Sequence, residues 1–456
     1  MSGRPAGRWE SGSALLSAPG TWASSAGNAS PGRRRNLPLT SAQEKTVAGA
    51  ADQARDRVAI RADRAFDGRA VISGGALVLC ADGKIVGVEP GTAPVPEGWP
   101  AAEYPGATLL PGLIDCHVHL CADSRTGALD RLPGYSDEQL GQVIEAALRA
   151  QLAAGVTTVR DLGDRRWAVL DWRDRIAAGR AGFPSPAVVA SGPPITTPGG
   201  HCWHMGGEAG RLGELRAAVR EHAERGVDII KVMASGGVMT AGTDVLACQY
   251  TLEQLRTVTD EAHAWGLAVT AHAHGLPAVI QAVDTGADGI EHCSCLTERG
   301  IEVPQDLPGR LARNQIIVCP TLGRKPGGTP PPAVLAIEQR TGLTWPDRQA
   351  LAGKLHQAGV LIASGADAGI SDGKPHGVLA LAIADLIAGG IPAADALASA
   401  TTLAAQACGL GDRKGRLHPG YDADLAVVDG DPLADIAALT AVRAVYLGGR
   451  AARPAT

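Results

Sequence analysis

The sequence predicts an α/β protein: a (β/α)8 barrel of the TIM type with a small β-sandwich domain built from both chain ends. Between residues 111 and 412, short runs rich in Val and Ile alternate with stretches of helical periodicity. Residues 56–110 and 413–456 instead contain short strands and turns. Strands that are apolar throughout are typical of parallel sheets covered on both faces, and eight of them are what a barrel requires.

Composition fits this division and excludes several classes of protein. The chain has 456 residues, of which 45% are hydrophobic, so it can bury a large core. A net charge of −5 excludes a strongly basic nucleic-acid binder. Gly, Asp or Arg interrupts the apolar runs well before the roughly 18 residues that a membrane span needs. We therefore expect neither nucleic acid nor a membrane as a partner.

Residues 1–45 differ from the rest of the chain. They are rich in Gly, Ser, Pro, Ala and Arg and show no sustained periodicity, which predicts a disordered N-terminal tail. The apolar run 14–16 is too short for the core of a signal peptide. Nine scattered cysteines without a Cys-x-x-Cys pair are typical of a reduced, cytoplasmic protein.

The two chain ends predict strands and tight turns. Runs 76–79 and 84–88 flank Asp82-Gly83, a dipeptide favoured in two-residue β-hairpin turns. Near the C-terminus, runs 424–430 and 441–449 have the same apolar texture. We expect these segments to form the β-sandwich together.

The middle of the chain contains eight apolar runs that we expect to be the barrel strands. In order they are 113–119, 156–162, 187–191, 229–234, 268–274, 289–293, 316–320 and 361–365. The clearest helical patterns between them cover 214–225 and 252–265. An open, doubly wound sheet is the alternative arrangement.

Side chains that can bind metal ions recur at the ends of these strands. His117 and His119 end the first strand two positions apart, so both point to one face. Because the functional face of a barrel lies at the carboxyl ends of its strands, other polar residues converge there. These are Lys231, His272, His274, Glu291, His292 and Asp367. Imidazole and carboxylate suit a divalent ion such as zinc, so we predict a metal centre.

The loop 196–207 follows the third expected strand on the same face and contains His201 and His204. Either imidazole is a candidate to donate a hydrogen bond to a reacting carbonyl. Alternatively, the loop's histidines only face solvent or shape the pocket. Tyr250 is a weaker candidate, and Arg160 at the end of the second strand is expected to form a structural ion pair or a pocket wall.

These motifs together resemble the amidohydrolase superfamily, in the branch of Xaa-Pro dipeptidases and imidazolonepropionase-like hydrolases. Segments 110–119, 230–237, 271–275 and 290–292 carry the resemblance. Segment 415–431 resembles the strand that returns to the superfamily's β-sandwich.

The resemblance implies two divalent metal ions, most simply zinc. It assigns His117, His119 and Asp367 to the more buried ion, and His272 and His292 to the second. It also implies that carbon dioxide carboxylates Lys231 to a carbamate that bridges both ions. A buried lysine readily becomes a neutral amine, which is the form that takes up carbon dioxide. The residues alone leave His274 open as a ligand, while the branch's spacing favours His272.

The implied function is a metal-dependent hydrolase that cleaves a peptide-like or N-acyl amino acid amide bond with a metal-bridged hydroxide. Its expected catalytic residues are Asp367, His201 and His204. The alternative is a mononuclear deaminase or cyclic-amide hydrolase. Such enzymes typically use a Glu three residues after the fifth-strand histidine, where this chain has Gly275 or Pro277. A catalytically silent relative is expected to lose ligands, whereas all six are present. As partners we expect a small-molecule amide substrate and further copies of the chain in a homo-oligomer.

Overall fold

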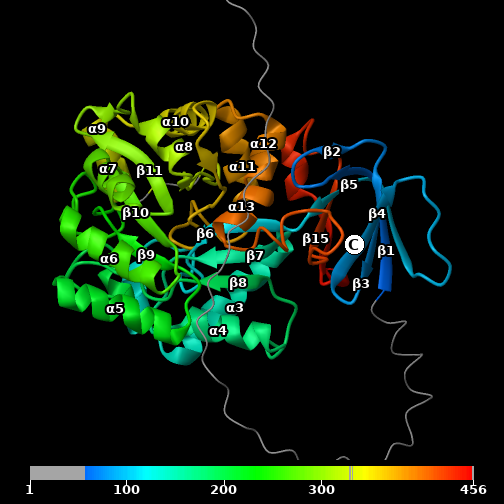
Figure 1. The fold of residues 1–456 in the computed structure, drawn as a ribbon, viewed down its shortest axis with the longest axis horizontal. Helices are drawn as coiled ribbons and strands as arrows, with labels where there is room; N and C mark the ends of the chain where they lie inside the picture. The colour runs from blue at the N-terminus through cyan, green and yellow to red at the C-terminus, as the bar shows by residue number, and fades with distance from the viewer. Residues whose placement is uncertain (1–56, 328–329, 331, 454–456) are drawn as a thin grey trace, which may run out of the picture. The chain divides into compact units, whose positions relative to one another are not determined.

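The computed structural model describes residues 57–327, 330 and 332–453. The predicted disordered tail, 1–45, lies outside these residues. In the described part, strands and helices alternate along the chain from residue 113 onward, as an α/β protein requires (Figure 1). The domain boundaries derived from the sequence stay predictions.

Strands from both chain ends pair in one sheet. Its order is β17-β16-β15-β5-β1-β3-β4, and β2 pairs with β1. The strands are β1 (Arg57–Phe66), β2 (Val71–Ile72), β3 (Ala76–Ala81), β4 (Lys84–Pro90), β5 (Ala101–Pro111), β15 (Leu425–Asp429), β16 (Val442–Leu447) and β17 (Arg450–Arg453). The antiparallel β5–β15 pair joins the two ends, with Leu109 opposite Val427. The predicted hairpin is confirmed as β3–β4. The second layer of a sandwich stays a prediction.

Each of the eight apolar runs in the middle of the chain contains a strand, and all eight pair in parallel. One sheet has the order β6-β7-β8 and the other β9-β10-β11-β13-β14, with the short β12 added antiparallel to β11. The strands are β6 (Leu113–Val118), β7 (Val156–Asp161), β8 (Ala187–Ala190), β9 (Ile230–Met233), β10 (Val269–Gly275), β11 (Gly289–Thr297), β12 (Gly300–Ile301), β13 (Ile317–Cys319) and β14 (Leu361–Ile362).

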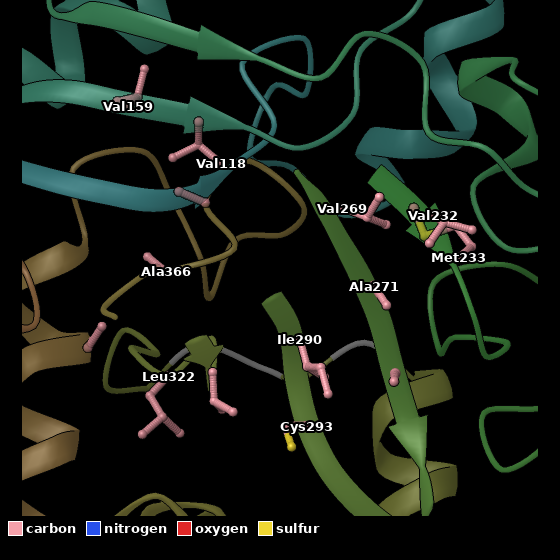
Figure 2. Packing of buried hydrophobic residues seen from close by; sticks show 14 of the residues in the cluster. Val118, Val159, Val232, Met233, Val269, Ala271, Ile290, Cys293, Leu322 and Ala366 are labelled. Atoms are coloured by element: carbon pink, nitrogen blue, oxygen red, sulfur yellow. The ribbon is translucent and has the colours of Figure 1, made fainter. Parts of the chain in front are cut away.

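The edges of these two sheets meet at isolated parallel bridges. Ile195, after β8, bridges Val232 of β9, and Val118 of β6 bridges Ala368, after β14. A barrel brings these edges together, although closure of the complete ring stays a prediction. Figure 2 shows Val232, Ala271 and Ile290 from three neighbouring strands among the packed apolar side chains.

Helices connect the parallel strands. They are α2 (Ala128–Arg131), α3 (Asp137–Ala153), α4 (Ala168–Ala177), α5 (Leu212–Arg225), α6 (Leu252–Ala264), α7 (Leu276–Thr285), α8 (Leu307–Arg313), α9 (Pro332–Thr341), α10 (Trp345–Gln357), α11 (Leu379–Ala388), α12 (Ala393–Ala398) and α13 (Thr402–Ala407). The two helices with the clearest sequence pattern are confirmed as α5 and α6. Among the described helices, none is long and apolar enough to cross a membrane.

Helices α10 and α11 approach each other through two glycines. A Cβ atom added to Gly353 would lie 1.9 Å from the carbonyl oxygen of Gly389. A Cβ atom added to Gly389 would lie 2.1 Å from the carbonyl oxygen of Gln349. Both contacts are with backbone, which cannot rotate away as a side chain can. Because both residues are glycines, α10 can pack this closely against the end of α11.

We expect Gly353→Ala to lower the free energy of unfolding by about 1–3 kcal/mol, because the new methyl group overpacks the contact. The matched control is Gly213→Ala in α5, where an added Cβ meets nothing within 4 Å. There the gain in helix propensity is expected to stabilise the protein by up to about 1 kcal/mol. Urea unfolding of both variants tests this, and equal stabilisation by the two changes would contradict it.

Candidate metal centre

The residues predicted at the strand ends line one cavity. Its polar lining includes all six expected ligands and one of the two loop histidines: His117, His119, Lys231, His272, His292, Asp367 and His201. They come from β6 and the residue directly after it, from β9, β10 and β11, and from the loops after β8 and β14. His204 is not part of this lining. Its Nε2 atom lies 3.6 Å from the Oδ1 atom of Asp130.

His117, His119 and Asp367 form a first group of possible ligands. Their ligand atoms lie within 4.8 Å of one another. The Nε2 atoms of His117 and His119 lie 3.5 and 3.4 Å from the same carboxylate oxygen, Oδ1 of Asp367. All three residues are buried. Two imidazole nitrogens and one carboxylate oxygen facing a common point are a donor set suited to zinc.

The other ring nitrogen of each of these histidines has its own acceptor. Nδ1 of His117 lies 2.7 Å from Oε2 of Glu291, and Nδ1 of His119 lies 3.1 Å from the carbonyl oxygen of Gly163. Each Nδ1 therefore carries a proton and donates it, which leaves Nε2 as the ring nitrogen that can bind a metal ion. Such partners orient the histidines of metal sites.

His272, His274 and His292 form a second group, with ligand atoms again within 4.8 Å of one another. Nε2 of His272 donates to the carbonyl oxygen of Gly236 at 3.2 Å, which leaves Nδ1 free. His274 and His292 instead use Nδ1 to contact hydroxyl oxygens, at 2.9 and 2.7 Å. The structure thus places both histidines of the β10 pair beside His292.

Lys231 of β9 is 1% exposed, at the same cavity. Burial lowers the pKa of its amine, although Glu291 and Asp367 oppose this shift. Among the described residues, no carboxylate lies within 4 Å of its Nζ atom. An amine in these surroundings is more easily neutral than one at the surface.

Burial and neighbouring charges shift the pKa of each member of the first group. Burial would raise the pKa of Asp367, but His117 and His119 hold it far below its usual value, so the carboxylate is ionised. Burial lowers the pKa of His117 to about 4, so its imidazole is neutral at pH 7. For His119, burial is the largest single effect and lowers the pKa, but the hydrogen bond to Asp367 and the charges of Asp367 and Asp161 together outweigh it, so the pKa is raised.

Four residues at the cavity have left-handed backbone conformations. The φ angles are +59° at Cys202, +66° at His292, +50° at Thr321 and +55° at Asp367. None is a glycine, so each conformation costs of order 1–3 kcal/mol, and such residues cluster at functional sites. His292 lies within β11, while the others lie in the loops that follow β8, β13 and β14.

Behind His117 lies a buried ion pair. Nη2 of Arg160 lies 2.9 Å from Oε1 of Glu291, whose Oε2 accepts the hydrogen bond from His117. Thr270 donates to the same Oε1 atom at 2.6 Å. The expectation of a structural ion pair at Arg160 is confirmed. Arg160 and His117 hold the pKa of Glu291 far below its usual value, although burial alone would raise it.

His201 reaches the cavity from the loop after β8. Its Nδ1 atom lies 3.0 Å from the Thr240 hydroxyl, and its Nε2 atom has the Cys202 thiol at 3.5 Å, a weak partner. Burial, with a smaller contribution from Lys231, lowers its pKa to about 3, so the ring is neutral. Tyr250 donates to the carbonyl oxygen of Ala209 at 2.8 Å and is not part of the cavity lining.

Sequence reasoning missed several residues of the cavity wall. Among them are Trp345 and Arg348 of α10 and Lys374, which follows β14. In the sequence, α10 is a mixed polar helix whose charged residues read as solvent-exposed. No local pattern marks the side that faces the cavity.

We expect Arg160→Met to lower the free energy of unfolding by about 3–5 kcal/mol, because it leaves the Glu291 carboxylate buried without its cation. The double variant Arg160→Met, Glu291→Gln should lose less stability than Arg160→Met alone, because it also removes the buried negative charge. Arg299→Met removes a pair on the surface and should change stability little. Denaturant unfolding measures all three, and a double variant less stable than Arg160→Met alone would contradict the expectation.

Comparison with known proteins agrees with this geometry. The amidohydrolase family model matches residues 108–452. An ochratoxinase from Aspergillus niger is 28% identical over 387 residues, 75% of each chain. An imidazolonepropionase from Stenotrophomonas maltophilia is 29% identical over 417 residues, 81% of this chain and 89% of that one. A solved Xaa-Pro dipeptidase with bound methionine matches with a TM-score of 0.76 and 26% identity, over 87% of this chain and 99% of that one. The predicted resemblance is confirmed, and this chain belongs to the amidohydrolase family.

Proposed function

We propose that this protein is a metal-dependent hydrolase of a peptide-like or N-acyl amino acid amide bond. The observation that carries the proposal is the pair of ligand groups, His117–His119–Asp367 and His272–His274–His292, at one cavity that Lys231 also lines. The similarity to a dipeptidase and an ochratoxinase supports amide hydrolysis.

In this proposal His117, His119 and Asp367 hold one divalent ion, while His272 and His292 hold a second. Free lone pairs on Nε2 of His117 and Nδ1 of His272 support these roles, since the other nitrogen of each ring has an acceptor. Lys231, as a carbamate, would supply the shared anionic ligand. Its burial and lowered pKa support the neutral amine that this modification needs.

Two divalent ions, when bound, would lower the pKa of a water molecule toward neutrality and polarise the amide carbonyl. Asp367 would accept a proton from the attacking water as its oxygen bonds to the carbonyl carbon. The same carboxyl would then deliver that proton to the amide nitrogen as the C–N bond breaks. The products are a carboxylic acid and an amine, and Asp367 returns to its ionised form.

His201 would donate a hydrogen bond from Nε2 to the carbonyl oxygen as negative charge develops there. The weak Cys202 contact leaves this nitrogen available. Only His201 of the two loop histidines enters the proposal, because His204 contacts Asp130 away from the cavity lining.

A cyclic-amide hydrolase or deaminase with one metal ion is the second candidate. The similarity to imidazolonepropionase favours it. Lys231 at the cavity and the absence of a Glu three residues after His272 or His274 count against it.

The test is a screen of the zinc-loaded protein against dipeptides and N-acyl amino acids, with identification of both products. We expect Asp367→Asn to abolish turnover, because the amide cannot carry the proton. Zinc content must be measured on the same samples. Asp367→Asn protein that binds two zinc ions and keeps near-wild-type turnover would contradict the assigned role.

A further inference from the structure

Arg348 brings a positive charge without a carboxylate partner to the candidate metal centre. It lies on α10 and lines the same cavity, with its guanidinium 4.9 Å from the ring centre of Trp345. Only Nη2 makes hydrogen bonds, to the carbonyl oxygen of Pro320 at 3.2 Å and the hydroxyl of Thr321 at 3.3 Å. No carboxylate of the described chain lies within 4 Å of it. Its Nη1 and Nε groups donate to no other described residue.

The acidic groups nearest to Arg348 are committed elsewhere. Glu338 pairs with Arg324 at 3.6 Å. Asp385 accepts hydrogen bonds from the Trp345 indole at 3.1 Å and from a backbone N–H group at 2.8 Å. Asp367 faces the two histidines of β6. The charge of Arg348 is therefore left for an anion from outside the chain.

The neighbouring cation, Lys374, does not compete for that role. Its Nζ atom donates to the carbonyl oxygens of Thr321, Leu322 and Ala366, at 2.8, 3.4 and 2.8 Å. These bonds use all three of its N–H groups. Lys374 thus ties the loop after β13 to the residue before Asp367, and unlike Arg348 it keeps no free donor.

Arg348 is close to the reacting centre. The Thr321 hydroxyl that accepts from Nη2 of Arg348 is also 2.7 Å from Nδ1 of His292. A single hydroxyl group therefore separates the guanidinium from a candidate metal ligand. An anion bound by Arg348 would lie beside the second ligand group.

The cavity that Arg348 lines also has apolar walls. Its apolar lining includes Met233, Met239, Val245, Leu296, Ile337 and Ile370. A ligand that satisfies both features has one anionic group and an apolar body. A carboxylate fits best, because its two oxygens match the planar fork of a guanidinium. The Trp345 ring under the guanidinium holds the plane of that fork.

We propose that Arg348 binds the carboxylate of the substrate, and that the enzyme therefore selects amides with a free carboxylate beside an apolar side chain. The inference rests on the proposed amide hydrolysis and names its substrate class. Neutral amides of the same shape would be poor substrates, since they leave the guanidinium unpaired.

The test compares N-acetyl-L-leucine with its neutral counterpart N-acetyl-L-leucinamide as substrates of the zinc-loaded protein. We expect Arg348→Gln to lower kcat/KM for the acid about 10- to 100-fold, mainly through KM, and to lower kcat/KM for the neutral amide far less. Arg348→Lys keeps the charge without the planar fork, so its kcat/KM for the acid should lie between those of the unchanged protein and of Arg348→Gln. Arg324→Gln, whose charge is already paired with Glu338, should have a much smaller effect.

Calorimetric titration of the zinc-loaded Asp367→Asn protein with the same two compounds separates this inference from the proposed function. Selective binding of the acid that Arg348→Gln abolishes supports the carboxylate site even if neither compound is hydrolysed. Equal affinity for acid and amide, or acid binding that survives Arg348→Gln, would overturn it. A loss for Arg324→Gln as large as that for Arg348→Gln would also overturn it.

Discussion

Every imidazole of the candidate metal centre is oriented by a hydrogen bond at one ring nitrogen, and the geometry of the cavity depends on this. Glu291 and Gly163 accept from the two β6 histidines, and Gly236 accepts from His272. Each bond fixes which nitrogen carries the proton and where the free lone pair points. Glu291 can do this while fully buried because Arg160 compensates its charge. The Arg160–Glu291 ion pair thus fixes the orientation of His117 and the ring nitrogen that can bind a metal ion.

The cavity contains buried groups of opposite charge. Asp367 stays ionised among histidines, and the lowered pKa of Lys231 favours its neutral amine. Beside the second ligand group, Arg348 has no carboxylate partner in the described chain. A cation-binding cluster next to an unpaired guanidinium would bind a substrate at its amide and at its carboxylate together. Binding energy from the remote group could then position the reacting bond.

The sequence was most informative where the fold is locally periodic. Alternation along β6 was enough to place His117 and His119 on one face, and the ends of apolar runs identified Lys231, His292 and Asp367. Local patterns do not encode contacts between distant elements. Two examples are the pairing of Arg160 with Glu291 and the cavity-facing side of α10.

Backbone conformation was the second thing that the sequence could not supply. His204 and His201 are three residues apart in one loop, yet only His201 lines the cavity, because the turn around Cys202 has a left-handed φ of +59°. The residues alone also left His274 open as a ligand beside His272, and both lie beside His292. Strain of this kind is maintained by tertiary contacts, which no single-sequence pattern reports.

The most direct test of the central claim is X-ray diffraction from crystals of the zinc-loaded protein, recorded on both sides of the zinc absorption edge. We expect two anomalous peaks, one at bonding distance from His117, His119 and Asp367 and one at bonding distance from His272 and His292. Electron density beyond Nζ of Lys231 should reach both. A single peak, or zinc held without Lys231, would contradict the account.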